Sequence, residues 1–500
     1  MENNIYTPPF PTGKKELRLC LAIGILAVLM MDFWVYGGLN LGFSLSCAGL
    51  IIASAVYLLR NGCRLNGYSG ALLALCLVLC ASFVRSDDGF VKFVTLCFLL
   101  LSYNLGLCLL AGRNRRSPAG VASLLDSFRA LFYLGFGKLS LSMGGLNEAR
   151  KNSGTAGKKH MDVVIGLLVA IPLVAVLICL LISADAAFEG LLSLLPRINF
   201  SEPLYALILG LPLACWLYTR TVALKHTPKP EAAVYAANGI HALTMNTALG
   251  AVCVVYVVYL FSQLAYFVGG FSGILPENYT MAEYARRGFF EMAWLSAINL
   301  AVMTLAAGLV ARKQNRAPLT TRCMCLFIGL VTLFFVVTAS AKMLMYINSY
   351  GLTRLRVLTE VIMVFIGLTT IFVSLWLFLP KFAYMKAVLL TALTIGAAVA
   401  WADVDTVVAA YNVSAYQSGR LGTVDVSYLA RLSDGVVPFL AELAQGEDPL
   451  LADQARQALY RHSCSEVEDF RSVNIASVIA HTYEKYFPDP VDDTEYASVT

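Results

Sequence analysis

The segment E-Y-A-R-R-G-F-F-E-M-A-W-L-S-A-I-N-L-A-V-M-T-L-A-A-G-L-V-A, Glu283–Ala311, places two arginines and a glutamate directly before a long apolar run. From Met292 to Ala311 a helix would be about 30 Å long at ~1.5 Å per residue, enough to cross the hydrocarbon core of a bilayer. The segment therefore predicts a membrane-spanning helix with a charged entrance.

Runs of this kind recur along the whole chain of 500 residues. Hydrophobic residues make up 58% of it and charged residues only 14%, whereas a soluble domain carries about a quarter charged residues. We expect about eleven spans, near residues 17–37, 40–60, 69–85, 90–111, 161–183, 202–219, 245–269, 288–311, 323–347, 357–380 and 387–403. The sequence predicts an all-α, polytopic transmembrane helix bundle.

Basic residues precede the first run, but no small-residue cleavage site follows it, so we expect a retained anchor rather than a signal peptide. Most Lys and Arg of the short loops fall on one side when the spans alternate, which predicts a cytoplasmic N-terminus and an extracytoplasmic C-terminus. The cysteines lie mostly inside apolar runs and are expected to be small buried residues.

Composition divides the chain into five predicted parts. Residues 1–111 hold the first four spans, 112–160 a basic cytoplasmic loop, and 161–403 the remaining spans; an acidic extracytoplasmic helical domain at 404–487 and a flexible tail at 488–500 follow. In the loop, apolar residues repeat at helical spacing, which predicts an amphipathic helix on the inner membrane surface. Docking of a partner on this helix is left open.

The C-terminal part differs in charge from the rest of the chain. From residue 402 onward there are 16 acidic and 6 basic residues, a net of −10, which leaves +15 elsewhere because the whole chain carries +5. Asp or Ser before an apolar segment and Pro at a first helical position mark helix starts. Ser433-Asp434 and Asp448-Pro449 fit this pattern and predict two short helices.

Ionisable residues inside spans cost about 2.5–3.5 kcal/mol each at the bilayer centre and are functional candidates by default. The candidate outer-face polar cluster consists of Arg286, Arg287, Glu291, Lys342, Tyr346, Tyr350, Arg354, Arg356 and Glu360. Two further intramembrane polar candidates are Asp32 and Asn299.

Two interpretations of the cluster remain open. In the first, Arg287–Glu291 and Arg356–Glu360 are i, i+4 pairs at helix entrances, with each glutamate in a first turn where the helix dipole favours it. In the second, the charges converge on an outward-facing pocket beneath the C-terminal domain, with Lys342 approaching Glu360. Such a pocket would suit an anionic ligand, a lipid headgroup or a peptide.

Several motifs resemble those of a bacterial membrane family, catalogued as domain of unknown function 4173, and of its relative 4153. They are S-A-D-A-A-F from Ser183, E-Y-A-R-R-G-F-F-E from Glu283, S-A-K-M-L-M-Y-I from Ser340, Y-G-L-T-R-L-R-V from Tyr350, A-A-Y-N-V-S-A-Y, and V-S-Y-L-A-R-L-S-D-G-V-V-P. The resemblance covers roughly residues 160–460. It implies a multi-pass protein of the bacterial inner membrane and carries no assigned activity.

No residue pattern identifies a reaction. We therefore expect no catalytic residues, no cofactor, no metal site and no nucleic-acid partner, and the five histidines lack metal-ligand spacing. The favoured function is a non-enzymatic envelope scaffold or sensor that contacts membrane lipids and an unidentified protein partner or anionic ligand. The alternatives are a small-solute transporter, for which Asn299 is a midplane candidate, and a lipid-linked transferase using the pair Asp87-Asp88.

Overall fold

The computed structural model describes residues 10–85, 87–113, 121–152, 201–227, 239–270, 281–311, 316–463, 471–483 and 486. Over these residues the secondary structure is helical, apart from isolated β-bridge residues that include the pair Ile240 and Val310. Nine helices in the described part are long and apolar enough to cross a membrane. The chain is an all-α, multi-pass integral membrane protein, which confirms the predicted fold class.

The chain forms two compact units, and each is described by itself. Unit 1 comprises Met1–Ala232, Ser433–Val437 and Tyr460–Asp489, within the described ranges. Unit 2 comprises Ala233–Leu432, Pro438–Leu459 and Pro490–Thr500, within the same limits. The C-terminal region therefore contributes residues to both units.

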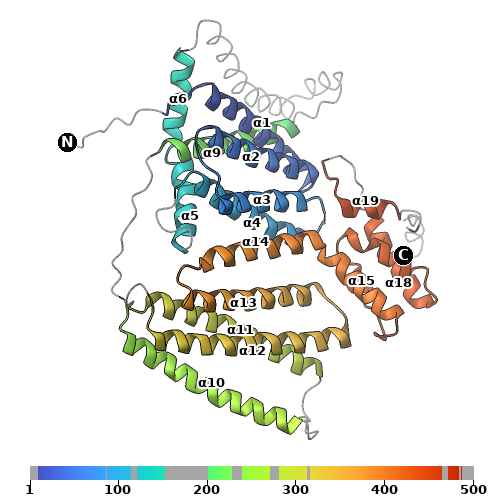
Figure 1. The fold of residues 1–500 in the computed structure, drawn as a ribbon. Coiled ribbons are helices and arrows are strands. Elements are labelled where there is room, and N and C mark those ends of the chain that lie inside the picture. The colour runs from blue at the N-terminus through green and yellow to red at the C-terminus, as the bar shows by residue number, and fades with distance from the viewer. Residues whose placement is uncertain are drawn as a thin grey trace, which may run out of the picture. The chain divides into compact units, whose positions relative to one another are not determined.

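Unit 1 contains the first group of apolar helices (Figure 1): α1 (Lys14–Gly37), α2 (Leu41–Arg60), α3 (Gly67–Ser82), α4 (Gly89–Leu110) and α9 (Ser201–His226). Its other helices are α5 (Val121–Gly135), α6 (Leu139–Asn152), the 3-10 helix η1 (Asp434–Val436) and α19 (Ile475–His481). With 16 residues, α3 is the shortest of the apolar helices in this part. The predicted span at 161–183 lies outside the described residues.

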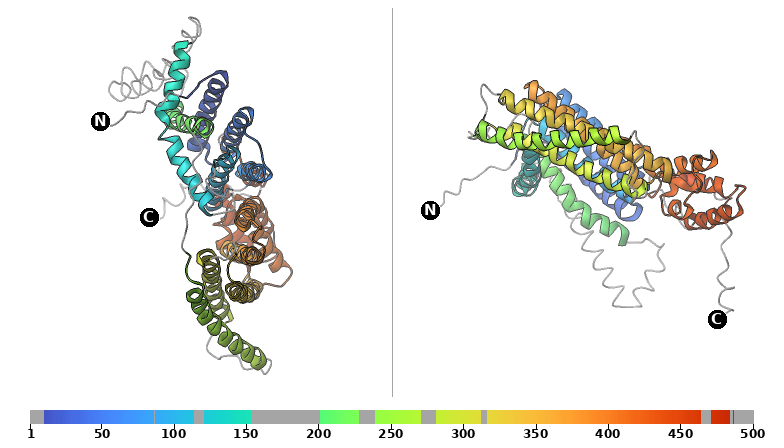
Figure 2. Two further views of the ribbon diagram at one scale, coloured as in Figure 1. Left: turned by 60° about the vertical axis from the view of Figure 1, so that its left-hand side comes forward. Right: turned by 90° about the horizontal axis from the view of Figure 1, so that it is seen from below.

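Unit 2 contains α10 (Ala242–Gly270), α11 (Met281–Leu309), α12 (Leu319–Tyr350), α13 (Arg354–Phe378) and α14 (Tyr384–Ala402). Figures 1 and 2 show α11, α12 and α13 side by side, and α10 packs on α12. Their shared core is built around fully buried side chains such as Met303, Phe335 and Met363. The C-terminal region continues with α15 (Val404–Gln417), α16 (Val426–Leu429), α17 (Val437–Leu443) and α18 (Pro449–Ser463).

Local sequence explains several helix boundaries. Asp403 adopts φ 51°, the one positive φ outside glycine in the described backbone, and separates α14 from α15. Asp448 caps α18 as predicted, because its carboxylate accepts hydrogen bonds from the backbone N–H groups of Leu450 (3.0 Å) and Leu451 (3.3 Å). Ser433 makes no such side-chain cap.

The prediction that Glu291 and Glu360 lie in the first turns of their helices is wrong. Helix α11 begins at Met281, so Glu291 lies ten residues inside it. Helix α13 begins at Arg354, which places Glu360 six residues inside and leaves the first turn without an acidic residue. Because the dipole effect fades within the first turn, it does not account for either glutamate.

Candidate functional site: a clamp on the α12–α13 turn

The turn between α12 and α13 in unit 2 is tightly constrained. Gly351 follows the end of α12 with φ 76°, and a Cβ there would lie 2.7 Å from Oδ1 of Asn412. Thr353 then caps α13 by accepting a hydrogen bond from the backbone N–H of Arg356 (3.4 Å). Glycine is required at position 351 by both the left-handed backbone and the close approach of Asn412.

Asn412, on α15, holds this turn through its side-chain amide. Its Oδ1 accepts a hydrogen bond from the backbone N–H of Leu352 (2.7 Å), and its Nδ2 donates to the carbonyl of the same residue (2.8 Å). One side chain thus satisfies both main-chain polar groups of Leu352, a residue that lies outside any helix.

Arg354 is the charged part of the same arrangement. Its Nε and Nη2 donate to the two carboxylate oxygens of Asp405 on α15, at 2.8 and 2.5 Å. The Asp405 side chain is 0% exposed and that of Arg354 is 30% exposed. The backbone N–H of Arg354 also donates to the hydroxyl of Tyr428 (2.9 Å). We call Asp405, Asn412 and Tyr428, together with the turn they hold, the clamp.

The Arg356 side chain contacts residues of the same α12–α13 turn and of the end of α12. Its guanidinium lies 4.1 Å from the ring centroid of Tyr346, at cation–π distance. Its Nη1 donates to the carbonyls of Tyr350 (3.1 Å) and Gly351. The Tyr346 and Tyr350 rings are 5.1 Å apart. This arginine therefore stabilises the C-terminal end of α12, where backbone carbonyls lack helical partners.

The other charges of the predicted cluster form separate local contacts. Lys342 interacts electrostatically with Glu291 of α11, not with Glu360 as expected. Glu360 lies beside the Ser340 hydroxyl of α12, and its buried Oε1 has no hydrogen-bond partner among the described atoms. The backbones of Arg286 and Arg287 lie in α11, while their side chains are outside the described residues.

The structure thus brings Tyr346, Tyr350, Arg354 and Arg356 together, and adds three residues that the sequence interpretation missed: Asp405, Asn412 and Tyr428. A signal for two of them was present. Val404, Val408 and Ala409 mark the buried face of α15, and Asp405 and Asn412 share that face by helical spacing. Polar residues on an apolar helix face imply polar partners.

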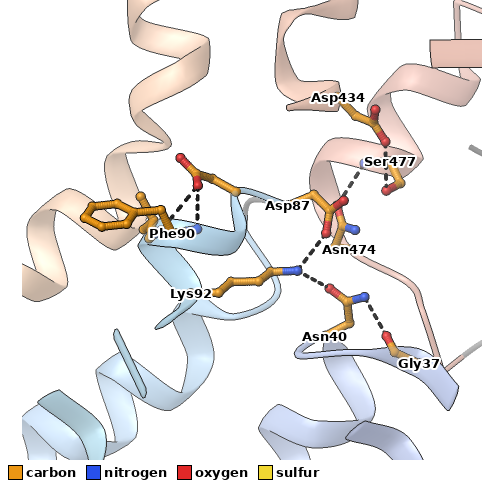
Figure 3. A network of polar contacts seen from close by, with 10 residues as sticks. Gly37, Asn40, Asp87, Phe90, Lys92, Asp434, Asn474 and Ser477 are labelled. Carbon is orange, nitrogen blue, oxygen red and sulfur yellow. Dashed lines mark hydrogen bonds and ion pairs between the residues drawn. The ribbon is translucent and has the colours of Figure 1, made fainter. Parts of the chain in front are cut away.

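A second polar network, which we call the latch, lies in unit 1 (Figure 3). The Lys92 ammonium donates to Oδ1 of Asn40 (2.6 Å) and pairs with Asp87 (2.8 Å), and Asn40 donates to the carbonyl of Gly37 (2.7 Å). It joins the α1–α2 turn to the start of α4.

The latch also includes the end of the C-terminal region. Asp32 of α1 pairs with Arg471 at 3.5 Å, and the Arg471 guanidinium lies 5.7 Å from the ring centroid of Tyr36. The backbone N–H of Leu41 donates to the carbonyl of Val473 (3.3 Å). Asp32, predicted as an intramembrane polar residue, therefore has a partner in the C-terminal region.

Two more contacts complete the latch. The backbone N–H of Ile475 donates to the carbonyl of Val84 in the α3–α4 turn (2.7 Å). Asp434 accepts a hydrogen bond from the Ser477 hydroxyl (3.3 Å) and contacts Nδ1 of His462 at 3.0 Å. Asp434 is the first residue of η1, in agreement with the predicted helix start, and its carboxylate also joins α18 and α19.

The residues singled out for transferase and transporter chemistry have structural contacts. Asp88 caps α4 by accepting from the backbone N–H groups of Phe90 (2.8 Å) and Val91 (3.3 Å), and Asp87 pairs with Lys92. The Tyr256 hydroxyl of α10 donates to Oδ1 of Asn299 on α11. These contacts need no substrate to explain them.

Arg220 is a buried cation that directly follows the predicted span at 202–219. Helix α9 continues to His226, so Arg220 lies inside it with 0% exposure. Its Nη2 donates to Oδ1 of Asn104 (2.5 Å), and its guanidinium lies 5.0 Å from the ring centroid of Tyr103. Its Nε and Nη1 are buried without hydrogen-bond partners among the described atoms.

Comparison with known proteins gives one family. A family model described as "Domain of unknown function (DUF4153)" matches residues 71–443. No curated protein and no solved structure matches the chain. The match is to the relative of the family first suggested by the motifs, so the name 4173 is corrected to 4153. All residues of the clamp fall inside the matched range, whereas Asp32, Asn40 and Arg471 of the latch fall outside it.

Proposed function

The chain belongs to the DUF4153 family, and from this premise we propose that it is a non-enzymatic scaffold of the bacterial inner membrane. In this proposal the N-terminus is cytoplasmic and the C-terminal helical region is extracytoplasmic. The membrane helices hold that region in a fixed position, and its surface is presented to a protein partner in the envelope.

The clamp is the observation that carries the proposal. Both arginines at the start of α13 are engaged within the chain, Arg354 by Asp405 and Arg356 by Tyr346 and two backbone carbonyls. An anionic ligand at this place would have to displace charge-assisted hydrogen bonds that are already made. The arrangement favours a structural use of these charges over an open pocket for an anion.

The latch supports the same function independently. Its backbone hydrogen bonds join the C-terminal segment to the α1–α2 turn and to the α3–α4 turn of unit 1. The alternating topology predicts both turns, and the α12–α13 turn of unit 2, on the extracytoplasmic side. A segment joined to both turns of unit 1 by backbone hydrogen bonds suits a fixed platform better than a tethered mobile domain.

The surface of the platform would be acidic. Several carboxylates of the C-terminal region are exposed: Asp425, Glu442, Glu447, Asp448 and Asp453. Because Asp405 and Asp434 are buried in the clamp and the latch, the exposed set is separate from the residues that hold the region. A partner with a basic surface would be favoured electrostatically.

Complementation tests the proposal. Cells that lack the protein receive the parent chain, Asp405→Asn, Arg356→Gln or the exposed control Arg431→Gln. Envelope integrity is scored by detergent sensitivity, and docking by protease protection of the C-terminal region. A scaffold loses both properties together in the Asp405 variant and keeps both in the control. An Arg356 variant that keeps full protection but loses complementation would overturn the proposal in favour of a ligand site.

A sensor differs from a scaffold in that the clamp must open. Hydrogen exchange at the backbone N–H of Leu352 and Arg354 reports opening, because each of these groups is bonded to a clamp residue. Exchange as slow as in the core of α12 supports the scaffold. Rapid exchange in the folded protein would support the sensor.

A further inference from the structure

Helices α5 and α6 occupy the end of unit 1 opposite the latch. The latch residue Lys92 is near the start of α4, whereas Asn104, twelve residues later and about 18 Å along the helix, donates to the carbonyl of Ser127 on α5 (2.8 Å). Figure 1 shows α5 and α6 running across the ends of the unit 1 spans rather than along them. Both helices therefore run across the direction of the spans at this end of unit 1.

One face of α5 packs firmly on the bundle. Ser127 and Leu134 are buried, at 1% and 2% exposure. Gly135 approaches α9 so closely that a Cβ would meet the ring of Trp216. Beyond the span, Arg113 donates from Nε to the carbonyl of Leu224 (3.0 Å), and burial lowers its pKa. The burial of Ser127 and Leu134 and the approach of Gly135 to Trp216 fix which face of α5 points away from the protein.

The outward face of α5 and the turn that follows is aromatic. Phe128, Phe132 and Phe136 are spaced by four residues and are 48%, 60% and 63% exposed, and Tyr133 beside them is 58% exposed. Residues four apart on a helix lie on one line. A line of phenylalanines is costly to leave in water, and aromatic side chains are favoured where lipid headgroups meet acyl chains.

The charge around this face is basic. Arg129 is exposed, and the Lys138 ammonium lies 5.2 Å from the ring centroid of Tyr133. Residues 112–160 contain nine Lys and Arg against two acidic residues, a net of +7. A bilayer surface rich in anionic phospholipid attracts each Lys or Arg near it by about 1 kcal/mol. The charge therefore matches an anionic lipid surface.

We propose that α5 is an anionic-phospholipid binding surface, with Phe128, Phe132 and Phe136 inserted at the headgroup boundary and Arg129 and Lys138 bound to lipid phosphates. The helix is too short to span the bilayer. The occupant is the leaflet of the protein's own membrane on the side where α4 and α9 end. This surface does not depend on the clamp, the latch or the proposed scaffold function.

A first experiment locates the occupant. A photo-crosslinking phenylalanine is placed at Phe132 or, as the buried control, at Leu134 in the full-length protein in phosphatidylglycerol-containing nanodiscs. We expect lipid adducts from position 132 and intramolecular protein adducts from position 134. Adducts of position 132 with a second copy of the chain, or with the chain itself, would overturn the proposal.

A second experiment measures the charge preference. The midpoint of unfolding is followed in detergent micelles as phosphatidylglycerol or phosphatidylcholine is added to the parent, to Arg129→Gln/Lys138→Gln, or to the matched control Arg431→Gln/Arg461→Gln. Apparent affinity for phosphatidylglycerol should fall about fivefold for each α5 charge removed. It should be unchanged in the control, and phosphatidylcholine should not distinguish the variants.

Equal unfolding midpoints without lipid show that the α5 variant is folded. If its midpoint is lowered, the crosslinking at Phe132 still decides the occupant in the otherwise unchanged chain. An α5 variant with parental phosphatidylglycerol dependence would overturn the role of Arg129 and Lys138.

Discussion

Breaking the Arg354–Asp405 pair should have different consequences according to which partner is removed. The Asp405 side chain is 0% exposed, whereas the Arg354 side chain is 30% exposed. Arg354→Met takes away two charge-assisted hydrogen bonds and leaves a carboxylate in a buried position. Asp405→Asn keeps one acceptor oxygen for an arginine that can still reach water.

The magnitudes follow from these exposures. Removing one member of a buried ion pair costs about 3–5 kcal/mol of unfolding free energy, because the remaining charge is desolvated without compensation. We expect this cost for Arg354→Met. For Asp405→Asn we expect about 1–2 kcal/mol, because one hydrogen bond is lost and the remaining cation is partly solvated.

The double variant Arg354→Met/Asp405→Asn sharpens the test. Once the arginine is absent, replacing the carboxylate by a neutral amide removes the desolvation cost, so the double variant should be less destabilised than the sum by about 1–3 kcal/mol. The assay is SDS titration of the purified protein in mixed micelles, with helix content followed by circular dichroism. Arg431→Met, at an exposed position of the same C-terminal region, controls for loss of an arginine.

Two outcomes would refute the reasoning. Equal costs for the two single variants would mean that the burial difference between the partners has no energetic consequence. A double variant whose cost equals the sum would mean that the two side chains do not interact in the folded protein.

Two further comparisons use matched positions, measured by the same titration. Gly351→Ala should lower the unfolding free energy by about 2–4 kcal/mol, because φ is positive and the methyl group would displace Asn412. Gly419→Ala, with φ 72° and no atom within 4 Å of the added methyl group, should lower it by only about 1 kcal/mol. Similar losses for the two variants would exclude a role for the Asn412 contact. Asn104→Leu should lower the unfolding free energy by about 3–5 kcal/mol, because it leaves the buried Arg220 guanidinium without this acceptor. Arg220→Met should lower it by only about 1–3 kcal/mol, because it leaves a neutral amide short of a donor. The reverse order would show that the Arg220 charge is compensated elsewhere.

The membrane architecture could be predicted because span length and apolar composition are local properties of the sequence. Helix α12 covers its predicted span, and the amphipathic pattern of residues 121–132 correctly predicted α5. The positions of charged residues relative to the ends of the spans were predicted less well. The predicted span ended at residue 219, before Arg220. Helix α9 continues past Arg220 because an amide and an aromatic ring allow its guanidinium to be buried.

The partners within the candidate site were not predictable in the same way. Arg354 was identified as a candidate, but Asp405 lies 51 positions further along the chain and Tyr428 lies 74 positions further. Periodicity indicates which face of α15 is buried and does not indicate which turn it meets. The sequence therefore identified Arg354, one member of these contacts, and its partners Asp405 and Tyr428 became known only from the structure.

Intramembrane and boundary charges need compensation, and here the C-terminal region supplies part of it. Asp405 balances Arg354 in unit 2, and Arg471 balances Asp32 in unit 1. Without that region each of these membrane-helix charges would lose an opposite charge, which a bilayer does not replace. The C-terminal region therefore supplies a counter-charge to a membrane helix in each of the two units. On the proposed scaffold function, these two ion pairs would keep the C-terminal region attached to the membrane helices, because separating it would leave Arg354 and Asp32 without these counter-charges.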